Sequence, residues 1–307
     1  MQLIQRTYTG VHDQQRMMAL VTAHPQENFH IVDLPYRFSS WAFDNADNVG
    51  LWEDETGELC AWAALQTPFW AIDYASHPQV AAEVHPQLLA WADQRARQLV
   101  GTPFGRPAWF INVFARQNKR IADLEVAGFA SQAEVAENAW SKVLLQQTTP
   151  MIETQHKLPA GFVLRPLAGL REVSAYVDLH RAVFESESMT VAWRTRTLQQ
   201  AAYQPDLDLV IVDPAGALAA FCICWFTPHG IDGQPSGQIE PMGVRADLRG
   251  QGLGQLILSE GVRRLSARGA EQVVVETDNY RDAAFALYES VGFQVRENVL
   301  VFRKDYA

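Results

Sequence analysis

The segment Arg249-Gly250-Gln251-Gly252-Leu253-Gly254 carries the most information about the fold of this chain. It separates a strand-like stretch, Gly237 to Val244, from a helix-like stretch, Leu253 to Ala267. A loop that leads into a helix leaves backbone N–H groups without an intrahelical partner, and the helix dipole makes that end positive. Glycines there let a phosphate approach the backbone. The segment predicts a phosphate-binding loop, although a bare turn and helix cap would also explain it.

The sequence after this loop narrows the interpretation. A buried strand is expected from Gln272 to Glu276, and a second helix ends in Leu287-Tyr288-Glu289-Ser290-Val291-Gly292-Phe293. The chain here resembles the GNAT superfamily of acyl-CoA-dependent N-acetyltransferases, which read [QR]-x-x-G-x-[GA] after the fourth strand and close a later helix with L-Y-x-x-x-G-F. The matching residues are Arg249, Gly252 and Gly254 in the first motif, and Leu287, Tyr288, Gly292 and Phe293 in the second. The resemblance covers roughly the last half of the chain.

The resemblance implies acetyl-CoA as the cofactor and assigns residues to it. The pyrophosphate would lie on the loop Arg249, Gly250, Gln251, Gly252, Leu253 and Gly254. The backbone of Met242, Gly243 and Val244, at the end of the fourth strand, would bind the pantetheine arm. The asparagine that the family usually carries near the start of the last helix lies about two residues early here, at Asn279.

Two residues are candidates for proton transfer. Tyr288 occupies the position where the family places a tyrosine near the thioester sulfur, and a phenol with a pKa of about 10 can protonate a leaving thiolate. Glu240, on the fourth strand beside Pro241, resembles the family's general base for the amine. Proline in a strand indicates a bulge or an edge. Tyr288 packed beside Phe293, and Glu240 as an exposed charge or ion pair, remain the alternatives.

The acyl acceptor is less well specified. The family builds the acceptor site after its first strand, which here is the stretch from His180 to Trp193. Glu185, Glu187 and Trp193 in this stretch are candidates for holding a cationic acceptor, with a solvated loop as the alternative.

Composition limits the class of protein. With 307 residues, 48% hydrophobic and 20% charged, the chain is long enough for two ordinary globular domains. The formal net charge of −10 argues against a nucleic-acid partner. No long apolar run or apolar leader is present, so we expect a cytoplasmic protein without a membrane partner. Cys222 and Cys224 alternate on one strand and are expected to be core residues; no further clustered ligands complete a metal site.

The same order of elements occurs twice along the chain. Each half predicts a strand, a helix, a hairpin, further strands and helices, and a helix that ends in Gly-Phe, at Gly128-Phe129 and Gly292-Phe293. We therefore expect an α/β fold of two tandem GNAT-like domains, residues 1–152 and 153–307, each a mixed, mostly antiparallel sheet with helices on both faces. Tandem arrangements are known in the family, including mycothiol synthase, although no residue ties this chain to the mycothiol substrate.

The first half lacks the features that would make it catalytic. It has no glycine from Glu58 to Val100, and His77-Pro78-Gln79 stands roughly where the phosphate loop should be. Leu124 occupies the position that matches Tyr288 and cannot donate a proton. The first domain is therefore expected to be a degenerate structural partner.

Taken together, the sequence predicts an acetyl-CoA-dependent N-acetyltransferase that acts on the primary amine of a small molecule by direct attack. A peptide or protein amine as acceptor, and a CoA-binding sensor or scaffold without turnover, are the alternatives. The protein is expected to be a monomer or a homodimer.

Overall fold

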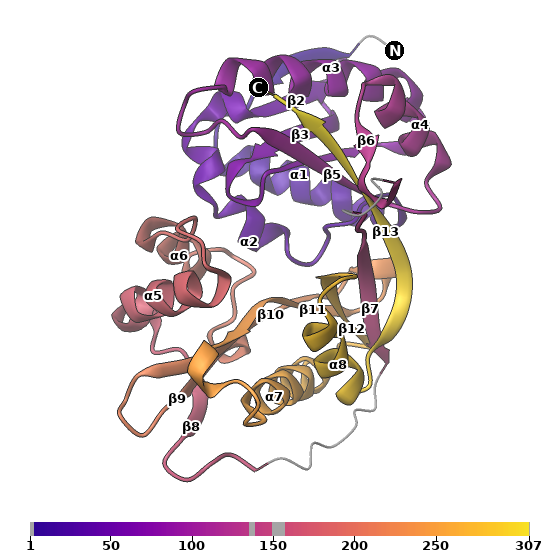
Figure 1. Cartoon of the computed structure of the whole chain (residues 1–307). Helices are drawn as coiled ribbons and strands as arrows, with labels where there is room; N and C mark the ends of the chain where they lie inside the picture. Colours follow the sequence, from indigo (N-terminus) through magenta and orange to yellow (C-terminus); the bar gives the residue numbers. More distant parts are fainter. Residues whose placement is uncertain (1–2, 135–138, 149–156, 307) are drawn as a thin grey trace. The chain divides into compact units, whose positions relative to one another are not determined.

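The computed structural model describes residues 3–134, 139–148 and 157–306, which divide into two compact units. The first unit comprises Met1–Lys142 together with Glu297–Ala307, and the second comprises Val143–Arg296. Figure 1 shows that each unit is a sheet with helices packed against it. The expected α/β class, with two tandem domains of mixed sheet, is confirmed.

The second unit is built around a sheet with the strand order β8-β9-β10-β11-β12-β7. Its strands β8 to β11 pair antiparallel, and β11 and β12 pair in parallel. The elements are β7 (Lys142–Thr148), β8 (Val163–Pro166), α5 (Val173–Phe184), α6 (Val191–Leu198), β9 (Asp208–Val212), β10 (Leu218–Thr227), β11 (Ser236–Val244), α7 (Leu253–Ala267), β12 (Gln272–Asp278) and α8 (Asp282–Ser290).

Helices cover both faces of this sheet because side chains alternate along β10. Cys222 and Cys224 point to one face, where a Cβ on Gly261 of α7 would lie 2.8 Å from the Cys224 sulfur. Phe221 points to the opposite face and contacts the rings of His180 and Phe184 of α5. Helix α7 therefore packs on the cysteine face and α5 on the other (Figure 1).

The first unit repeats this plan, with the strand order β1-β2-β3-β4-β5-β13 and a short β6 beside β13. Pairs β1/β2, β2/β3 and β3/β4 are antiparallel, and β4/β5 is parallel. The elements are β1 (Ile4–Thr7), α1 (Val11–Ala23), α2 (Leu34–Phe38), β2 (Val49–Glu53), β3 (Leu59–Gln66), β4 (Ala71–Ser76), α3 (Ala81–Leu99), β5 (Ala108–Phe114), α4 (Asn118–Val126), β6 (Ala130–Ser131) and β13 (Gln294–Asp305).

Strand β13 belongs to both units. It starts at Gln294 in the second unit, but Val299–Asp305 pair antiparallel with Ala108–Phe114 of β5 in the first. The first stretch of the first unit thus ends at Lys142. The unit resumes at Glu297, so most of β13 belongs to it. The expected boundary between residues 152 and 153 lies outside the described residues, and residues 297–307 were expected in the second domain.

Two helices differ from the sequence prediction. The sequence predicts a helix from about Pro86 to Leu99, but α3 begins at Ala81, because the proline lies inside the helix and does not mark its start. Helix α6 forms where a loop was considered, with the Thr190 hydroxyl accepting from the Trp193 N–H at 3.0 Å as its N-cap.

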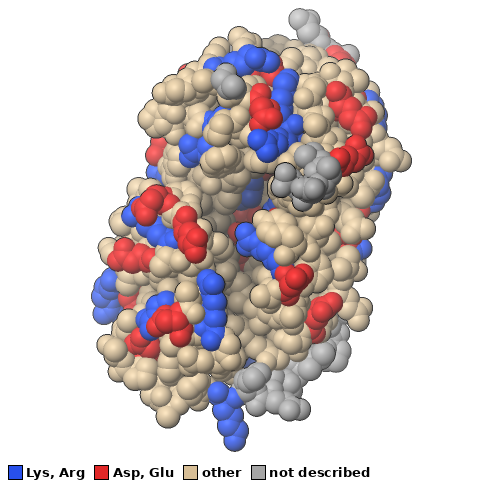
Figure 2. All heavy atoms as spheres, viewed as in Figure 1, with Lys and Arg blue, Asp and Glu red and all other residues tan. Residues whose placement is uncertain are grey.

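Charged residues are spread over the surface in small groups. On the face drawn in Figure 2, acidic and basic side chains are interspersed among uncharged ones. Within the described ranges, none of the helices has both the length and the apolar character needed to cross a bilayer.

Candidate acyl-CoA site

The glycine loop leads directly into α7. Gly250 and Gly252 have φ angles of +76° and +80°, in the left-handed region that favours glycine. Gly252 is the N-cap of α7, and no side chain makes a capping hydrogen bond there. Because nothing caps this end, the N–H groups of the first helical turn are directed out of the helix toward the loop. Helix α7 has 15 residues, so its dipole adds a positive end to the same spot.

Gly254 brings the loop, the end of β11 and α8 together. A Cβ on Gly254 would lie 3.3 Å from Leu287 Cδ2 and 3.5 Å from Val244 Cγ2. Its lack of a side chain therefore serves helix packing, whereas the positive φ of Gly252 serves the turn. Both motifs of the sequence, 249–254 and 287–293, meet at this point of the second unit.

Strands β11 and β12 separate beside the loop. They pair in parallel only at Ser236–Gln238 with Gln272–Val274. Beyond these, β11 stays paired on its other side, where Met242, Gly243 and Val244 face residues 222, 221 and 220 of β10. Over the described part of the two strands, residues 239–244 have no β12 partner. Met242, Gly243 and Val244, which the family resemblance assigns to the pantetheine arm, lie on this stretch without a β12 partner.

A bulge in β11 places Glu240. The register with β10 shifts between Cys222/Met242 and Cys224/Ile239, so Glu240 and Pro241 together face one residue of β10. The Trp225 indole N–H donates to the Glu240 carbonyl oxygen at 2.8 Å, which fixes the bulge. Glu240 is half-buried. In the sequence, Pro241 indicated a bulge or an edge at this point. The role of Trp225 was missed, because no local sequence pattern indicates a hydrogen bond between the two strands.

Tyr288 lies on α8 close to Glu240. Its side chain is buried, with its ring centroid 5.9 Å from that of Phe293. Burial raises the pKa of Tyr288 well above its usual range, and the charge of Glu240 raises it further. The phenol therefore keeps its proton at neutral pH, which an acid requires. Packing beside Phe293 and proton donation are compatible in this position.

The remaining predicted cofactor residues surround the loop in different ways. Arg249 Nε donates to the Val244 carbonyl oxygen at 3.2 Å, which closes the turn between β11 and α7. Gln251 is exposed, and the Leu253 side chain is buried in the core, so Leu253 offers only its backbone to a ligand. Asn279 is exposed in the turn that follows β12.

The predicted acceptor residues do not form one surface. Glu185 ends α5 with φ +49° and is exposed, and Glu187 is exposed and paired with Arg181 at 2.9 Å. Trp193 is buried in α6 and faces the core. Helix α5 itself is close to the site, because a Cβ on Gly243 would collide with Val183 and lie 3.0 Å from Phe221 Cζ.

A buried polar cluster beside α5 was not predicted. Arg194 and Asp208, both fully buried, form an ion pair, and the Tyr203 hydroxyl donates to Asp208 at 2.7 Å. The Arg194 guanidinium lies 3.9 Å from the centre of the Tyr176 ring. Burial and the Arg194 and Arg181 charges lower the pKa of His180 to about 3, so this ring is neutral. The pairing of Arg194 with Asp208 joins α6 to β9 and leaves no local signature in the sequence.

The cysteines are core residues. Cys222 and Cys224 are buried, with their sulfur atoms 3.8 Å apart beneath Gly261. Among the residues that the structure describes, no group of three His, Cys, Asp or Glu side chains could hold a metal ion.

The first unit has the same turns but not the same loop. Phe129 N donates to the Leu124 carbonyl at 3.0 Å, as Phe293 N does to Tyr288 at 3.1 Å, so Leu124 is the counterpart of Tyr288. In place of the glycine loop, His77 Nδ1 accepts from the Gln79 N–H at 3.2 Å and caps the turn before α3. Pro78 has no N–H to offer. In this turn the N–H of Gln79 is therefore satisfied and that of residue 78 is absent.

Comparison with known proteins agrees with this geometry. Residues 174–293 match the sequence profile described as the Acetyltransferase (GNAT) family. This segment is a GNAT-family domain. It contains β11, the glycine loop, α7, β12 and α8, the elements that build the site.

Curated relatives match about half of the chain. A protein named mycothiol acetyltransferase from Thermobispora bispora is 32% identical over 153 residues, which cover 48% of this chain and 50% of the relative. A second protein of that name, from Salinispora arenicola, is 31% identical over 161 residues, or 50% and 52% of the two chains. The chain thus spans about half the length of these curated relatives.

A solved structure extends the fold to both units. The GCN5-related N-acetyltransferase from Sphaerobacter thermophilus superposes with a TM-score of 0.65 at 18% identity, covering 99% of this chain and 96% of the other. The fold of that protein therefore extends over nearly the whole of this chain.

Proposed function

We propose that the second unit transfers an acetyl group from acetyl-CoA to the primary amine of a small molecule. The observation that carries the proposal is the meeting of an uncapped α7 N-terminus, an unpaired edge of β11 and the buried Tyr288 in one place. These three features supply anion binding, a docking edge and a proton donor, which acyl transfer from a thioester requires.

The residues fit acetyl-CoA in two separate places. The N–H groups at the start of α7, with Arg249, Gly250, Gln251, Gly252 and Leu253 around them, would hold the pyrophosphate. The stretch Met242, Gly243 and Val244, which has no β12 partner and whose Val244 carbonyl oxygen accepts from Arg249, would pair with the pantetheine arm. Gly254 keeps the two places in contact, and Asn279 borders them. When bound, acetyl-CoA supplies the activated acyl group as a thioester.

Glu240 and Tyr288 would handle the two protons of the reaction. Glu240 accepts a proton from the amine, whose nitrogen forms the new bond to the acyl carbon. Tyr288 donates its hydroxyl proton to the sulfur as the carbon–sulfur bond breaks. The products are the acetamide and free CoA thiol. After each turnover Tyr288 is left as a phenolate near Glu240. Its high pKa favours the return of a proton to the phenol before the next turnover.

The acceptor is proposed from the relatives and from the charge near the site. Glu185 and Glu187 are exposed near the end of α5 and would attract a cationic amine. Trp193 would support α6 from within the core, in view of its burial. Because the curated relatives are named mycothiol acetyltransferase, mycothiol-related amines are the first acceptors to test.

The proposal is tested by a panel of amines, with release of free CoA thiol from acetyl-CoA as the readout. Small amines, mycothiol-related amines and short peptides with a free amino terminus form the three arms. Turnover with a small amine supports the proposal, and turnover with peptides alone would reassign the acceptor. Binding of acetyl-CoA with no turnover across the panel would favour a CoA sensor.

A further inference from the structure

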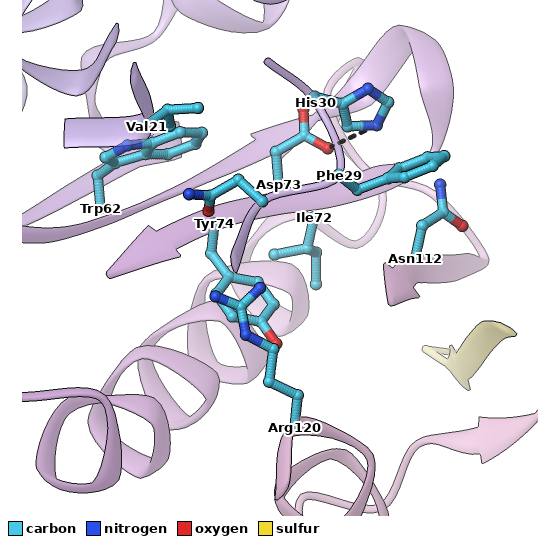
Figure 3. A pocket seen from close by; sticks show the side chains of 10 residues that line it. Val21, Phe29, His30, Trp62, Ile72, Asp73, Tyr74, Asn112 and Arg120 are labelled. Atoms are coloured by element: carbon cyan, nitrogen blue, oxygen red, sulfur yellow. Dashed lines mark ion pairs between the residues drawn. The ribbon is translucent and has the colours of Figure 1, made fainter. Parts of the chain in front are cut away.

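The first unit contains a cavity of its own, drawn in Figure 3. It lies where β4 and β5 separate: the two strands pair in parallel only at Ala71 and Phe110. Asp73 and Tyr74 of β4, Asn112 of β5 and Trp62 of β3 line it, together with residues of α1, α4 and the stretch 28–30. All of its lining residues belong to the first unit.

Several buried polar atoms around this cavity have no hydrogen-bond partner. They are Asn28 Oδ1, His30 Nε2, Trp62 Nε1 and Asn112 Oδ1. Asn28, His30 and Trp62 are nine-tenths buried or more. A buried polar atom without a partner costs about 1–3 kcal/mol, so four around one cavity indicate that something else satisfies them.

Among the described residues around the cavity, the Arg120 side chain is a cation that forms no ion pair. Arg37 pairs with Asp73 through Nε and Nη2, at 2.6 and 2.8 Å. His30 pairs with Asp33 at 3.0 Å. Arg120, on α4, is buried, and its guanidinium lies 5.1 Å from the centre of the Tyr74 ring. Across residues 3–134, 139–148 and 157–306 no carboxylate forms an ion pair with Arg120.

The surroundings of His30 add a second donor. Burial and the Arg37 charge lower the pKa of His30, but Asp33 and Asp73 raise it more, so the net shift is upward. In its protonated form Nε2 carries a hydrogen that makes no hydrogen bond within the protein, although Asp73 Oδ1 lies 3.9 Å away as an ion-pair partner. Trp62 Nε1 can only donate. Figure 3 shows the Arg120 side chain reaching from α4 to the Tyr74 ring, with Trp62 and His30 among the other lining residues.

We propose that this cavity, which we name the Arg120 pocket and define by Asn28, His30, Trp62, Tyr74, Asn112 and Arg120, binds the carboxylate group of a small acid. A guanidinium, an indole N–H and an imidazolium N–H are matched donors for two carboxylate oxygens. The unpartnered Asn28 and Asn112 oxygens would accept from a hydroxyl or amino group next to the carboxylate.

The size of the pocket selects a carboxylate over larger anions. Its volume is about 30 Å³, which is room for roughly two water molecules. Acetate has four non-hydrogen atoms and two oxygens that need donors, whereas phosphate has five such atoms and four oxygens, so the smaller anion suits this space better. The site is separate from the acyl-CoA site, because no residue of the second unit lines it.

Titration of the full chain with sodium acetate tests this proposal. At constant ionic strength, acetate should raise the Tm saturably by roughly 2–5 °C relative to sodium chloride. Inorganic phosphate should give no saturable shift. Direct binding of ¹³C-acetate should be detected by NMR at neutral pH.

Two variants and one control locate the effect. Arg120→Gln should abolish acetate binding, and Trp62→Phe should weaken it about tenfold without removing any charge. Lys119→Gln removes an exposed charge from the neighbouring position of α4 and should leave binding unchanged. Gly252→Asp, in the second unit, should also leave it unchanged. Acetate bound equally by Arg120→Gln, no saturable binding at all, or ordered water alone in an acetate-soaked crystal would each overturn the proposal.

Discussion

In both units two parallel strands separate at corresponding places in the sheet. The loop beside the separated strands differs between the units. In the second unit β11 leaves β12 after Gln238, beside a helix end that no side chain caps. In the first unit β4 leaves β5 after Ala71, but His77 caps the following turn and Pro78 removes an N–H. The separated strands are thus a property of the fold, and the loop residues decide whether an acyl-CoA can use them. In the first unit the opening is lined instead by the polar groups of the Arg120 pocket.

The sharpest contrast expected is in cofactor stoichiometry. Acetyl-CoA should bind one site per chain in calorimetry, because the second unit has the glycine loop beside its open strand edge, whereas His77 and Pro78 occupy that place in the first. The first unit should contribute no detectable heat. Two equivalent sites would show that the His77 and Pro78 turn does not prevent binding.

The next largest effect concerns Tyr288 and its counterpart. Tyr288→Phe keeps the ring beside Phe293 and removes the proton, so kcat should fall roughly 10²–10⁴-fold while acetyl-CoA affinity changes little. Leu124→Met, a volume-conserving change at the matching turn of the first unit, should leave kcat unchanged. Thermal stability measured on the same preparations separates lost chemistry from lost packing. A folded Tyr288→Phe protein with normal turnover would leave Glu240 and water as the groups to test.

A smaller effect is expected at the loop. Gly252→Asp places a side chain and a negative charge at a φ of +80° next to the pyrophosphate. The Kd for acetyl-CoA should rise at least about tenfold, equivalent to about 1.4 kcal/mol. Gly216→Asp is the matched control, since Gly216 lies in the β9–β10 turn with φ +85°, and a Cβ added there would meet no atom within 4 Å. Equal affinity in both variants would mean that the loop does not hold the cofactor.

The smallest expected difference compares the buried histidines of the two units. The pKa of His180 lies near 3, lowered by burial and by Arg194 and Arg181; that of His85 lies near 4, lowered by burial and Arg120. Each binds fewer protons folded than unfolded, so stability falls as the pH drops below about 6.5. Both ring nitrogens of His85 form hydrogen bonds, Nε2 with Ser76 and Nδ1 with Asp123. His180 Nδ1, in contrast, has no hydrogen-bond partner.

His180→Phe should therefore reduce the loss of stability between pH 7 and pH 5 by about 1–2 kcal/mol. Urea unfolding at the two pH values measures this loss. The replacement ring can still stack on Phe221, whose centroid is 5.7 Å from that of His180. His12→Gln, at an exposed position of α1, is the control and should behave like the wild type. An unchanged pH dependence in His180→Phe would show that this ring is not kept neutral by the fold.

Sequence reasoning succeeded where the signal is local. Helix α7 runs from Leu253 to Ala267 as predicted, because Gly252 marks its start and Gly269, with φ +91°, its end. The Gly-Phe turns at Gly128 and Gly292 likewise identified matching positions in the two halves. The α/β class and the GNAT resemblance followed from these local patterns and from their order.

It failed where distant segments meet. The Arg120 pocket combines side chains from α4, β3, β4, β5 and the stretch 28–30, and no spacing in the sequence brings them together. The destination of β13 had no local signal either, since its pairing with β5 joins residues far apart in the chain. Trp193 shows how a local pattern can mislead. A large aromatic side chain close to two carboxylates in the sequence suggested a binding surface, but the Trp193 side chain is buried in the core.

The pairing of β13 with β5 also has a consequence for biosynthesis. Residues 108–114 leave the ribosome long before residues 299–305, so the first sheet must wait with β5 as an unpaired edge while the whole second unit is made. An unpaired edge strand is open to wrong partners during that interval. The first unit therefore completes its sheet only after the second unit has been synthesised.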